Sequence, residues 1–156
     1  MSDYTLPRSA VAAQLLLTQG VSRPGQIFVM ERVPHHDGPE TPLELLNRQT
    51  GFFAFRPNDD AGVLLVAKAH TVSLTVERQT PISDPVRLSA ARMVGLECVL
   101  AGGATIGGWA SFELPQGSQR LLDYLNASGE PFFALWTHAS THFVNRAHVL
   151  YARPLE

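Results

Sequence analysis

The chain has 156 residues, of which 45% are hydrophobic, 17% charged and 8% aromatic, and its formal net charge is −2. This length suits one compact domain or two very small ones, and the apolar fraction is too high for a disordered chain. The lack of a basic excess disfavours nucleic acid as a partner, because neutralised phosphates supply most of the affinity of nucleic-acid-binding proteins.

The N-terminal residues show no basic start followed by an apolar core, and no apolar run approaches the roughly 20 residues that a membrane-spanning helix needs. We therefore expect a cytoplasmic protein without a membrane segment. Cys98 is the single cysteine, so an intrachain disulfide is excluded. We expect its thiol to be a small buried hydrophobe, because no residue beside it in the sequence would activate it as a nucleophile.

A short helix is predicted after the first two strands. Thr41 can cap this helix, Pro42 suits its first position, and Glu44 can complete a capping box. Asn47 is expected to end the helix, since asparagine tolerates the left-handed conformation at a helix C-terminus. Enrichment in β-branched and aromatic residues predicts the two preceding strands, at residues 12–19 and 26–33.

Two adjacent phenylalanines, Phe52 and Phe53, follow the helix in a predicted strand. Neighbouring side chains on a strand point to opposite faces, so one ring fills the core of its own sheet and the other points away from it. We expect the second ring to be covered by the helix leucines or, alternatively, by the other half of the chain. A turn at residues 57–62 then leads to a strand at 63–67.

The second half of the chain repeats landmarks of the first half in the same order, about 80 residues later. The matched segments are 15–20 with 98–103, 43–47 with 122–126, 52–55 with 132–135, and 69–72 with 147–150. In the second copy Ser118 is the expected helix cap. This self-match predicts a duplicated small domain.

The sequence therefore predicts a mainly β (α+β) protein made of two tandem ββαβββ repeats. We expect small curved sheets or partly open barrels that pack together with pseudo-two-fold symmetry. The first repeat spans 1–78, a linker spans 79–90 and contains Pro81 and Pro85, and the second repeat spans 91–156.

The second repeat resembles Sm-like small β-barrels over about fifty residues. The resemblance rests on the glycines 102, 103 and 107 and on a strand at 143–146 that runs into Ala147 and His148. The helix departs from that pattern, because it lies between the second and third strands and not before the first. The resemblance implies RNA binding as one alternative function. The LN…FF…H pattern is also similar to that of bacterial proteins, and no function follows from it.

Four histidines are candidate metal ligands. His35 and His36 are adjacent in a loop rich in glycine and proline, and His138 and His142 are four residues apart around a predicted turn. A metal site needs three or four converging donors, so these residues form one only if the fold brings them together. The alternative is a solvated loop and a turn without a ligand. A small metal-dependent enzyme is accordingly our second alternative function.

The leading hypothesis is a non-enzymatic protein–protein interaction, scaffold or regulatory module. The sequence shows no phosphate-binding loop, no nucleophile elbow and no compelling catalytic set, so we assign no catalytic residue and no cofactor. The expected partner is another protein or a second copy of the chain. Trp109 and Trp136 are the candidate partner-binding residues, because large exposed aromatic side chains dominate interface energetics; the alternative is that both pack in the core.

Overall fold

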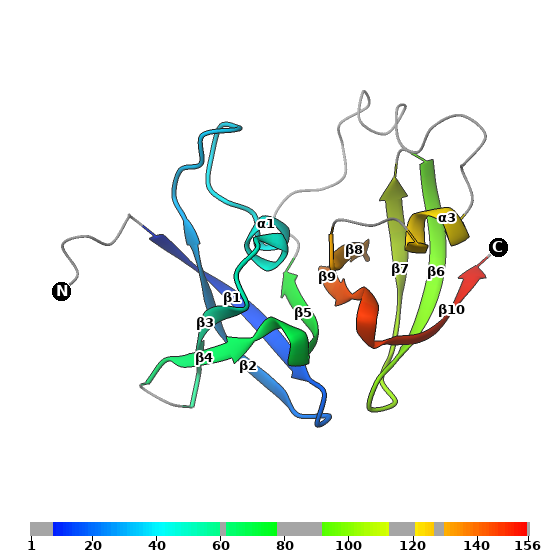
Figure 1. The fold of residues 1–156 in the computed structure, drawn as a ribbon, viewed down its shortest axis with the longest axis horizontal. Helices are drawn as coiled ribbons and strands as arrows, with labels where there is room; N and C mark the ends of the chain where they lie inside the picture. The colour runs from blue at the N-terminus through cyan, green and yellow to red at the C-terminus, as the bar shows by residue number, and fades with distance from the viewer. Residues whose placement is uncertain (1–7, 60–61, 78–91, 113–120, 127–129, 156) are drawn as a thin grey trace.

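The computed structural model describes residues 8–59, 62–77, 92–112, 121–126 and 130–155 (Figure 1). The ten strands in these ranges form one antiparallel sheet. The predicted linker at 79–90 and the expected cap Ser118 lie outside the described residues.

Each half of the chain contains two strands, a short helix, two strands, a 3₁₀ turn and a last strand. The first half comprises β1 (Arg8–Leu17), β2 (Ser22–Met30), α1 (Pro42–Asn47), β3 (Phe52–Pro57), β4 (Leu64–Ala67), η1 (Lys68–His70) and β5 (Thr71–Glu77). The second half comprises β6 (Arg92–Leu100), β7 (Thr105–Phe112), α3 (Leu121–Asn126), β8 (Phe132–Trp136), β9 (Ser140–Asn145), η2 (Arg146–His148) and β10 (Val149–Leu155).

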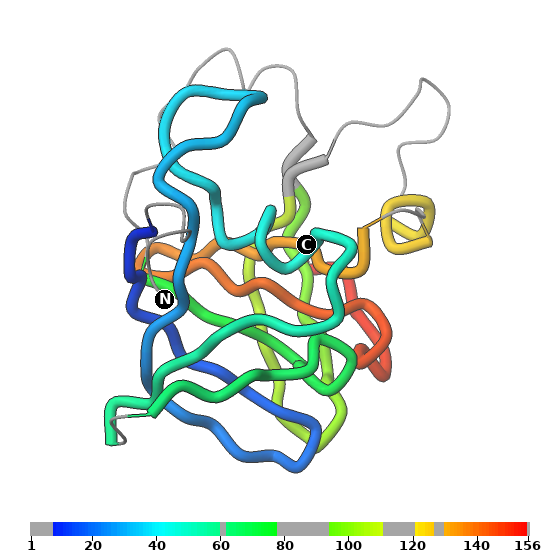
Figure 2. The backbone as a smooth tube through the Cα atoms, turned by 60° about the vertical axis from the view of Figure 1, so that its left-hand side comes forward, coloured from blue at the N-terminus to red at the C-terminus, as the bar shows by residue number. Residues whose placement is uncertain are grey.

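The strand order across the sheet is β10-β6-β7-β8-β9-β5-β1-β2-β3-β4. Strands β5 and β9 pair over five residues and join the two halves, as Figure 2 shows where the orange strands run beside the green one. The expectation of separate small sheets packed together is therefore wrong. Main-chain hydrogen bonds between β5 and β9 make the sheet continuous, and it is not closed into a barrel.

This junction has a consequence for symmetry, because it joins the fourth strand of one half to the fifth strand of the other. A two-fold axis that relates the two halves would exchange β5 with β10 and β9 with β4, so it would also require a ladder between β4 and β10. Among the ten described strands no such ladder exists, and β4 and β10 are the edges of the sheet. Duplication and pseudo-two-fold symmetry therefore stay predictions.

The buried side chains form two hydrophobic clusters, and the phenylalanine pairs show how the halves share them. Phe53 lies in the cluster of the first half, so one ring of the pair fills the core as predicted. The expected cover over the second ring is wrong for Phe52, which lies on strand β3 beside the edge strand β4 and is 62% exposed. In the second half both rings are buried: Phe133 lies in its own cluster, and Phe132 lies in the cluster of the first half, next to α1. For Phe132, the predicted alternative of cover by the other half is the one observed.

The first helix begins as its sequence predicts and ends differently. The Thr41 hydroxyl accepts a hydrogen bond from the Glu44 N–H, and the Glu44 carboxylate accepts one from the Thr41 N–H at 2.8 Å, so the capping box is present. The left-handed end expected at Asn47 is wrong. Asn47 is the last helical residue, as predicted, but the C-cap residue Arg48 that follows it has an extended backbone (φ −61°), and the only described residues with positive φ are glycines. The Asn47 side chain has a different role, described below.

A cation closes the C-terminus of each short helix. Lys68, the first residue of η1, donates from Nζ to the Leu45 and Arg48 carbonyls at 2.8 and 3.1 Å. Arg146, the first residue of η2, donates from Nη1 to the Tyr124 carbonyl at 2.9 Å. Both cations thus donate to carbonyls at the C-terminal end of a short helix, where the regular hydrogen-bond pattern of the helix ends.

The hairpins at the start of each half turn on glycine. Gly102 and Gly103 have φ of 91° and 97° between β6 and β7, a backbone conformation that favours glycine. Gly20, with φ of 85°, makes the corresponding turn between β1 and β2. The turn lies before Ser22, and strands β1 and β2 both begin and end earlier than the predicted ranges 12–19 and 26–33.

Candidate functional site

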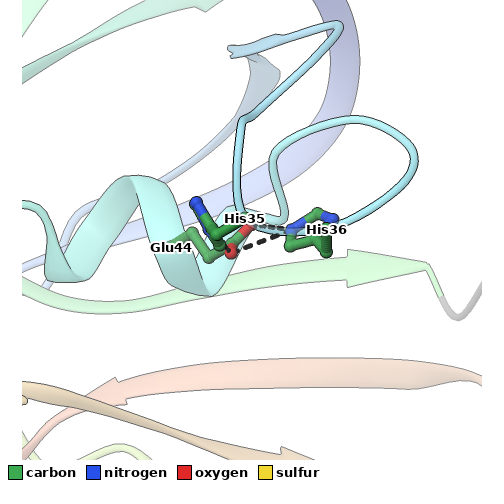
Figure 3. Close-up of side chains that lie close together, drawn as sticks. All are labelled: His35, His36 and Glu44. Atoms are coloured by element: carbon green, nitrogen blue, oxygen red, sulfur yellow. Dashed lines mark hydrogen bonds and ion pairs between the residues drawn. The ribbon is translucent and has the colours of Figure 1, made fainter.

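A cluster of two histidines and a glutamate lies where the loop after β2 meets the first turn of α1 (Figure 3). The His35 Nε2 atom is 2.6 Å from Glu44 Oε2, and the His36 Nε2 atom is 2.8 and 2.9 Å from the two Glu44 oxygens. The imidazole rings meet edge to face, with their centroids 4.8 Å apart. Both imidazoles therefore point at one carboxylate.

The base of this loop is anchored by a second, buried carboxylate. Glu40 accepts a hydrogen bond from the Met30 N–H at 3.1 Å and pairs with Arg48 through Nε at 2.7 Å and Nη2 at 3.1 Å. These contacts join the end of β2 to both ends of α1. The histidine loop is thus held at its base, while its tip is exposed.

The electrostatics of the cluster favour a charged carboxylate. Burial raises the pKa of Glu44, but the Thr41 N–H and both imidazoles lower it more strongly, to a net value of about 2. The hydrogen bond to Glu44 and a second one to the Asp37 carbonyl raise the pKa of His36. At neutral pH Glu44 is consequently an anion facing two nitrogen ligands.

The other two candidate histidines lie apart from this cluster. His142, on β9, hydrogen-bonds Thr75 Oγ1 on β5 at 2.7 Å, and its burial lowers its pKa. His138 is exposed in the turn between β8 and β9, beside an open groove at the junction. In the described part of the chain, His35, His36 and Glu44 form a group of three potential metal ligands, and His138 and His142 do not belong to it. Glu44 was not among the ligands predicted from the sequence, although its place three residues into the helix after the histidine loop was a usable signal.

The edge strand β4 carries a group of exposed apolar side chains, which we call the β4 patch. Leu65 is 75% exposed, and Phe52, on the neighbouring strand β3, is 62% exposed. The patch consists of Phe52, Val63, Leu64 and Leu65. Singly scattered exposed hydrophobics are ordinary, whereas a group along an unpaired strand is typical of surfaces that another chain covers.

The opposite edge of the sheet carries a second such group, which we call the β10 patch. It comprises three residues of β10 and one of α3: Leu150, Tyr151, Leu155 and Leu122. Of the ten large hydrophobic side chains that are exposed in the described residues, the two patches contain all but Val21 and Trp109. Exposed apolar surface is therefore concentrated at the two open edges.

The internal junction shows how two strands from different halves of this chain meet. Beside the β5–β9 ladder, the Asn47 side chain on α1 donates to the Phe132 carbonyl at 3.1 Å and accepts from the Phe132 N–H at 2.8 Å. The Asn145 side chain at the end of β9 donates to the carbonyls of Lys68 and Thr71. At the junction, the β5–β9 ladder is accompanied by an asparagine side chain of helix α1 that binds the main chain of β8.

The tryptophans are paired with each other across β7 and β8. Trp109 is 54% exposed, whereas Trp136 is half-buried. Trp109 therefore offers an aromatic surface to solvent, and its ring lies over Gly95 of β6, which pairs with Leu155 of the edge strand β10. Cys98 is buried, and this burial raises the pKa of its thiol to about 11, as expected of a residue without a nucleophilic role.

Comparisons with known proteins assign neither a family nor an activity. No family model, curated protein sequence or solved structure matches this chain. Neither α1 nor any other helix in the described ranges is long and apolar enough to cross a membrane.

Proposed function

We propose that this protein is a protein–protein interaction module, built from a duplicated small β-unit, that assembles head to tail with further copies of itself. Strand β4 of one copy pairs with strand β10 of the next. The observation that carries the proposal is the pair of exposed apolar patches on the two unpaired edges of one sheet. The chain's internal β5–β9 junction supplies the pattern for the contact.

Positions that are buried at the junction are exposed at the open edges. The predicted repeat matches Leu65 of β4 with Phe143 of β9, and these side chains are 75% and 6% exposed. It matches Phe52 with Phe132, which are 62% and 1% exposed. The apolar character at these positions supports a second, intermolecular junction that would cover Phe52 and Leu65.

The internal register predicts which residues would pair. Leu74 of β5 lies opposite Phe143 of β9. The repeat matches Leu74 with Ala152 of β10, so Ala152 is expected opposite Leu65 of the next copy. Pro154 on β10 has no N–H to donate, which removes at most one hydrogen bond from the new ladder.

The second helix would complete the contact. Asn126 ends α3 as Asn47 ends α1, and its side chain is exposed. In the assembly the Asn126 amide would bind the main chain of Phe52 in the next copy. Leu122, which is 62% exposed on α3, would be covered at the same time.

The size of the patches suits a reversible assembly. Burying one large apolar side chain contributes roughly 1.5–3 kcal/mol, and each junction would cover several of them. Association costs about 4–15 kcal/mol in lost freedom. We therefore expect assembly that depends on protein concentration, and not a permanent complex.

The first experiment measures mass in solution. Light scattering and sedimentation over a wide range of protein concentrations should show oligomers larger than one chain. Leu65→Lys should shift the protein to monomers, because the variant places a charge in the contact. Val21→Lys is the matched control, since Val21 is exposed but lies outside both patches.

Disulfide trapping tests the orientation. A mixture of Leu65→Cys and Ala152→Cys proteins should form a mixed disulfide faster than either protein links to itself. Rapid self-linking of Leu65→Cys would show that the contact is symmetric and would overturn head-to-tail pairing. A monomeric wild type at every concentration would overturn self-assembly altogether.

A further inference from the structure

We propose that His35, His36 and Glu44 form a binding site for a divalent transition-metal ion of the Zn²⁺ class. The site does not depend on the self-assembly proposed above, because these residues belong to neither patch. It uses two imidazole nitrogens and one carboxylate oxygen as ligands, and water fills the remaining position.

The donor atoms are close enough to share one ion. One ligand atom from each of the three residues lies within 4.8 Å of the others. Zinc binds nitrogen and oxygen at about 2.0–2.2 Å, so two ligands of a tetrahedral ion are separated by about 3.3 Å. The distances of 2.6 and 2.9 Å between Glu44 Oε2 and the two Nε2 atoms would need to open by less than 1 Å.

The hydrogen bonds outside the cluster orient one ligand. The His36 Nδ1 atom lies 2.8 Å from the Asp37 carbonyl oxygen, which can only accept. Nδ1 therefore carries the proton, and in the neutral ring Nε2 presents its lone pair to the carboxylate. A metal-bound histidine typically has this arrangement, with its other nitrogen donating to a carbonyl. The hydrogen bond to Glu44 also favours a proton on Nε2, and a metal ion placed between Nε2 and the carboxylate would displace that proton.

The helix cap leaves a carboxylate oxygen available. Glu44 Oε1 accepts the Thr41 N–H at 2.8 Å, and Oε2 is the oxygen nearest to His35. Metal binding through Oε2 would preserve the capping bond. One glutamate can therefore begin the helix and hold the ion, which would tie the histidine loop to α1.

The donor set selects the class of ion. Magnesium and calcium prefer shells made of oxygen, whereas imidazole suits zinc, copper and nickel. With two nitrogens among three protein ligands, the site fits the latter group. The exposure of His35 leaves water access to the fourth position.

The test is titration of Zn²⁺ into untagged, chelator-treated full-length protein, followed by calorimetry. We expect saturable binding of one ion per chain and a rise in the unfolding temperature with Zn²⁺. Replacing both ligands (His35→Ala with His36→Ala) should weaken binding at least tenfold, by comparison with the tenfold to hundredfold effect of outer-shell changes. His138→Ala, an exposed histidine outside the cluster, should bind as the wild type does.

Glu44→Gln tests the role of Glu44 as a metal ligand separately from its role in the helix cap. Glutamine also serves at this position of a capping box, so the metal-free variant should unfold close to the wild-type temperature. Its stabilisation by Zn²⁺ should be lost. Absence of saturable binding to the wild type, or equal affinity of the double histidine variant, would overturn the site.

Discussion

Replacing Lys68 with methionine tests how the short helix α1 is held in the sheet. Lys68 is buried, and its Nζ atom donates to Leu45 O, Arg48 O and Thr50 Oγ1 at 2.8–3.1 Å. Methionine retains most of the apolar stem and removes all three donors. The helix that carries Glu44 then loses the partner of its last carbonyls.

The expected loss of stability follows from two opposing effects. A hydrogen bond that involves a charged group contributes about 1.5–3 kcal/mol, so three of them exceed about 4 kcal/mol. Burial, with a further effect from Arg48, lowers the pKa of Lys68, which shows that taking its charge out of water offsets part of that gain. We expect a net loss of about 3 kcal/mol, a large share of the roughly 5–15 kcal/mol of a typical domain.

The assay is urea and thermal unfolding followed by circular dichroism. A loss of about 3 kcal/mol corresponds to a fall of roughly 6–12 °C in unfolding temperature for a chain of this size. Arg32→Met, at an exposed position, is the matched control and should change stability by less than about 0.5 kcal/mol. A Lys68→Met protein as stable as the control would contradict this prediction, since the desolvation of Lys68 would then cancel its hydrogen bonds.

Three further outcomes are expected. Asn47→Ala should destabilise the folded chain by about 1–3 kcal/mol, because it leaves the N–H and the carbonyl of Phe132 without their side-chain partner. Asn126→Ala should leave the unfolding temperature unchanged and weaken self-association measured by sedimentation. Gly108→Ala should lower the free energy of unfolding in urea by about 1–3 kcal/mol, since the new Cβ would lie 2.8 Å from a carbonyl oxygen of β8. Gly107→Ala is the control and should be nearly neutral, because the nearest atom to its new Cβ is 3.8 Å away. Burial lowers the folded-state pKa of His142 below 6.5. As the pH falls, the unfolded chain therefore takes up a proton at this residue before the folded chain does, and stability should fall below about pH 6.5. His142→Gln should flatten that part of a plot of urea midpoint against pH, and an unchanged slope would contradict the assignment.

Local features of the fold were predictable because their causes lie within a few residues. The capping box needs only Thr41 and Glu44, three positions apart, and the β6–β7 hairpin needs only Gly102 and Gly103. Burial of Phe53 likewise follows from the alternation of side chains along a strand. The left-handed end at Asn47 failed for a nonlocal reason: its side chain binds Phe132, which is 85 residues away.

The candidate site was predictable in part. His35 and His36 were singled out by residue type, whereas the pairing of both rings with Glu44 depends on how the loop folds back onto α1. The anchor of that loop, the Glu40–Arg48 pair, joins residues on both sides of the helix. A donor set of this kind becomes visible only when the loop has a defined conformation.

The sequence by itself determined the composition of each half and the order of its strands and short helix. Only the tertiary structure decided that β5 pairs with β9, which makes one sheet with free edges at β4 and β10. Strand pairing depends on main-chain hydrogen bonds, which are the same for every residue type except proline, so the sequence does not specify which edges meet. The apolar side chains left at those edges are what make their covering by another copy testable.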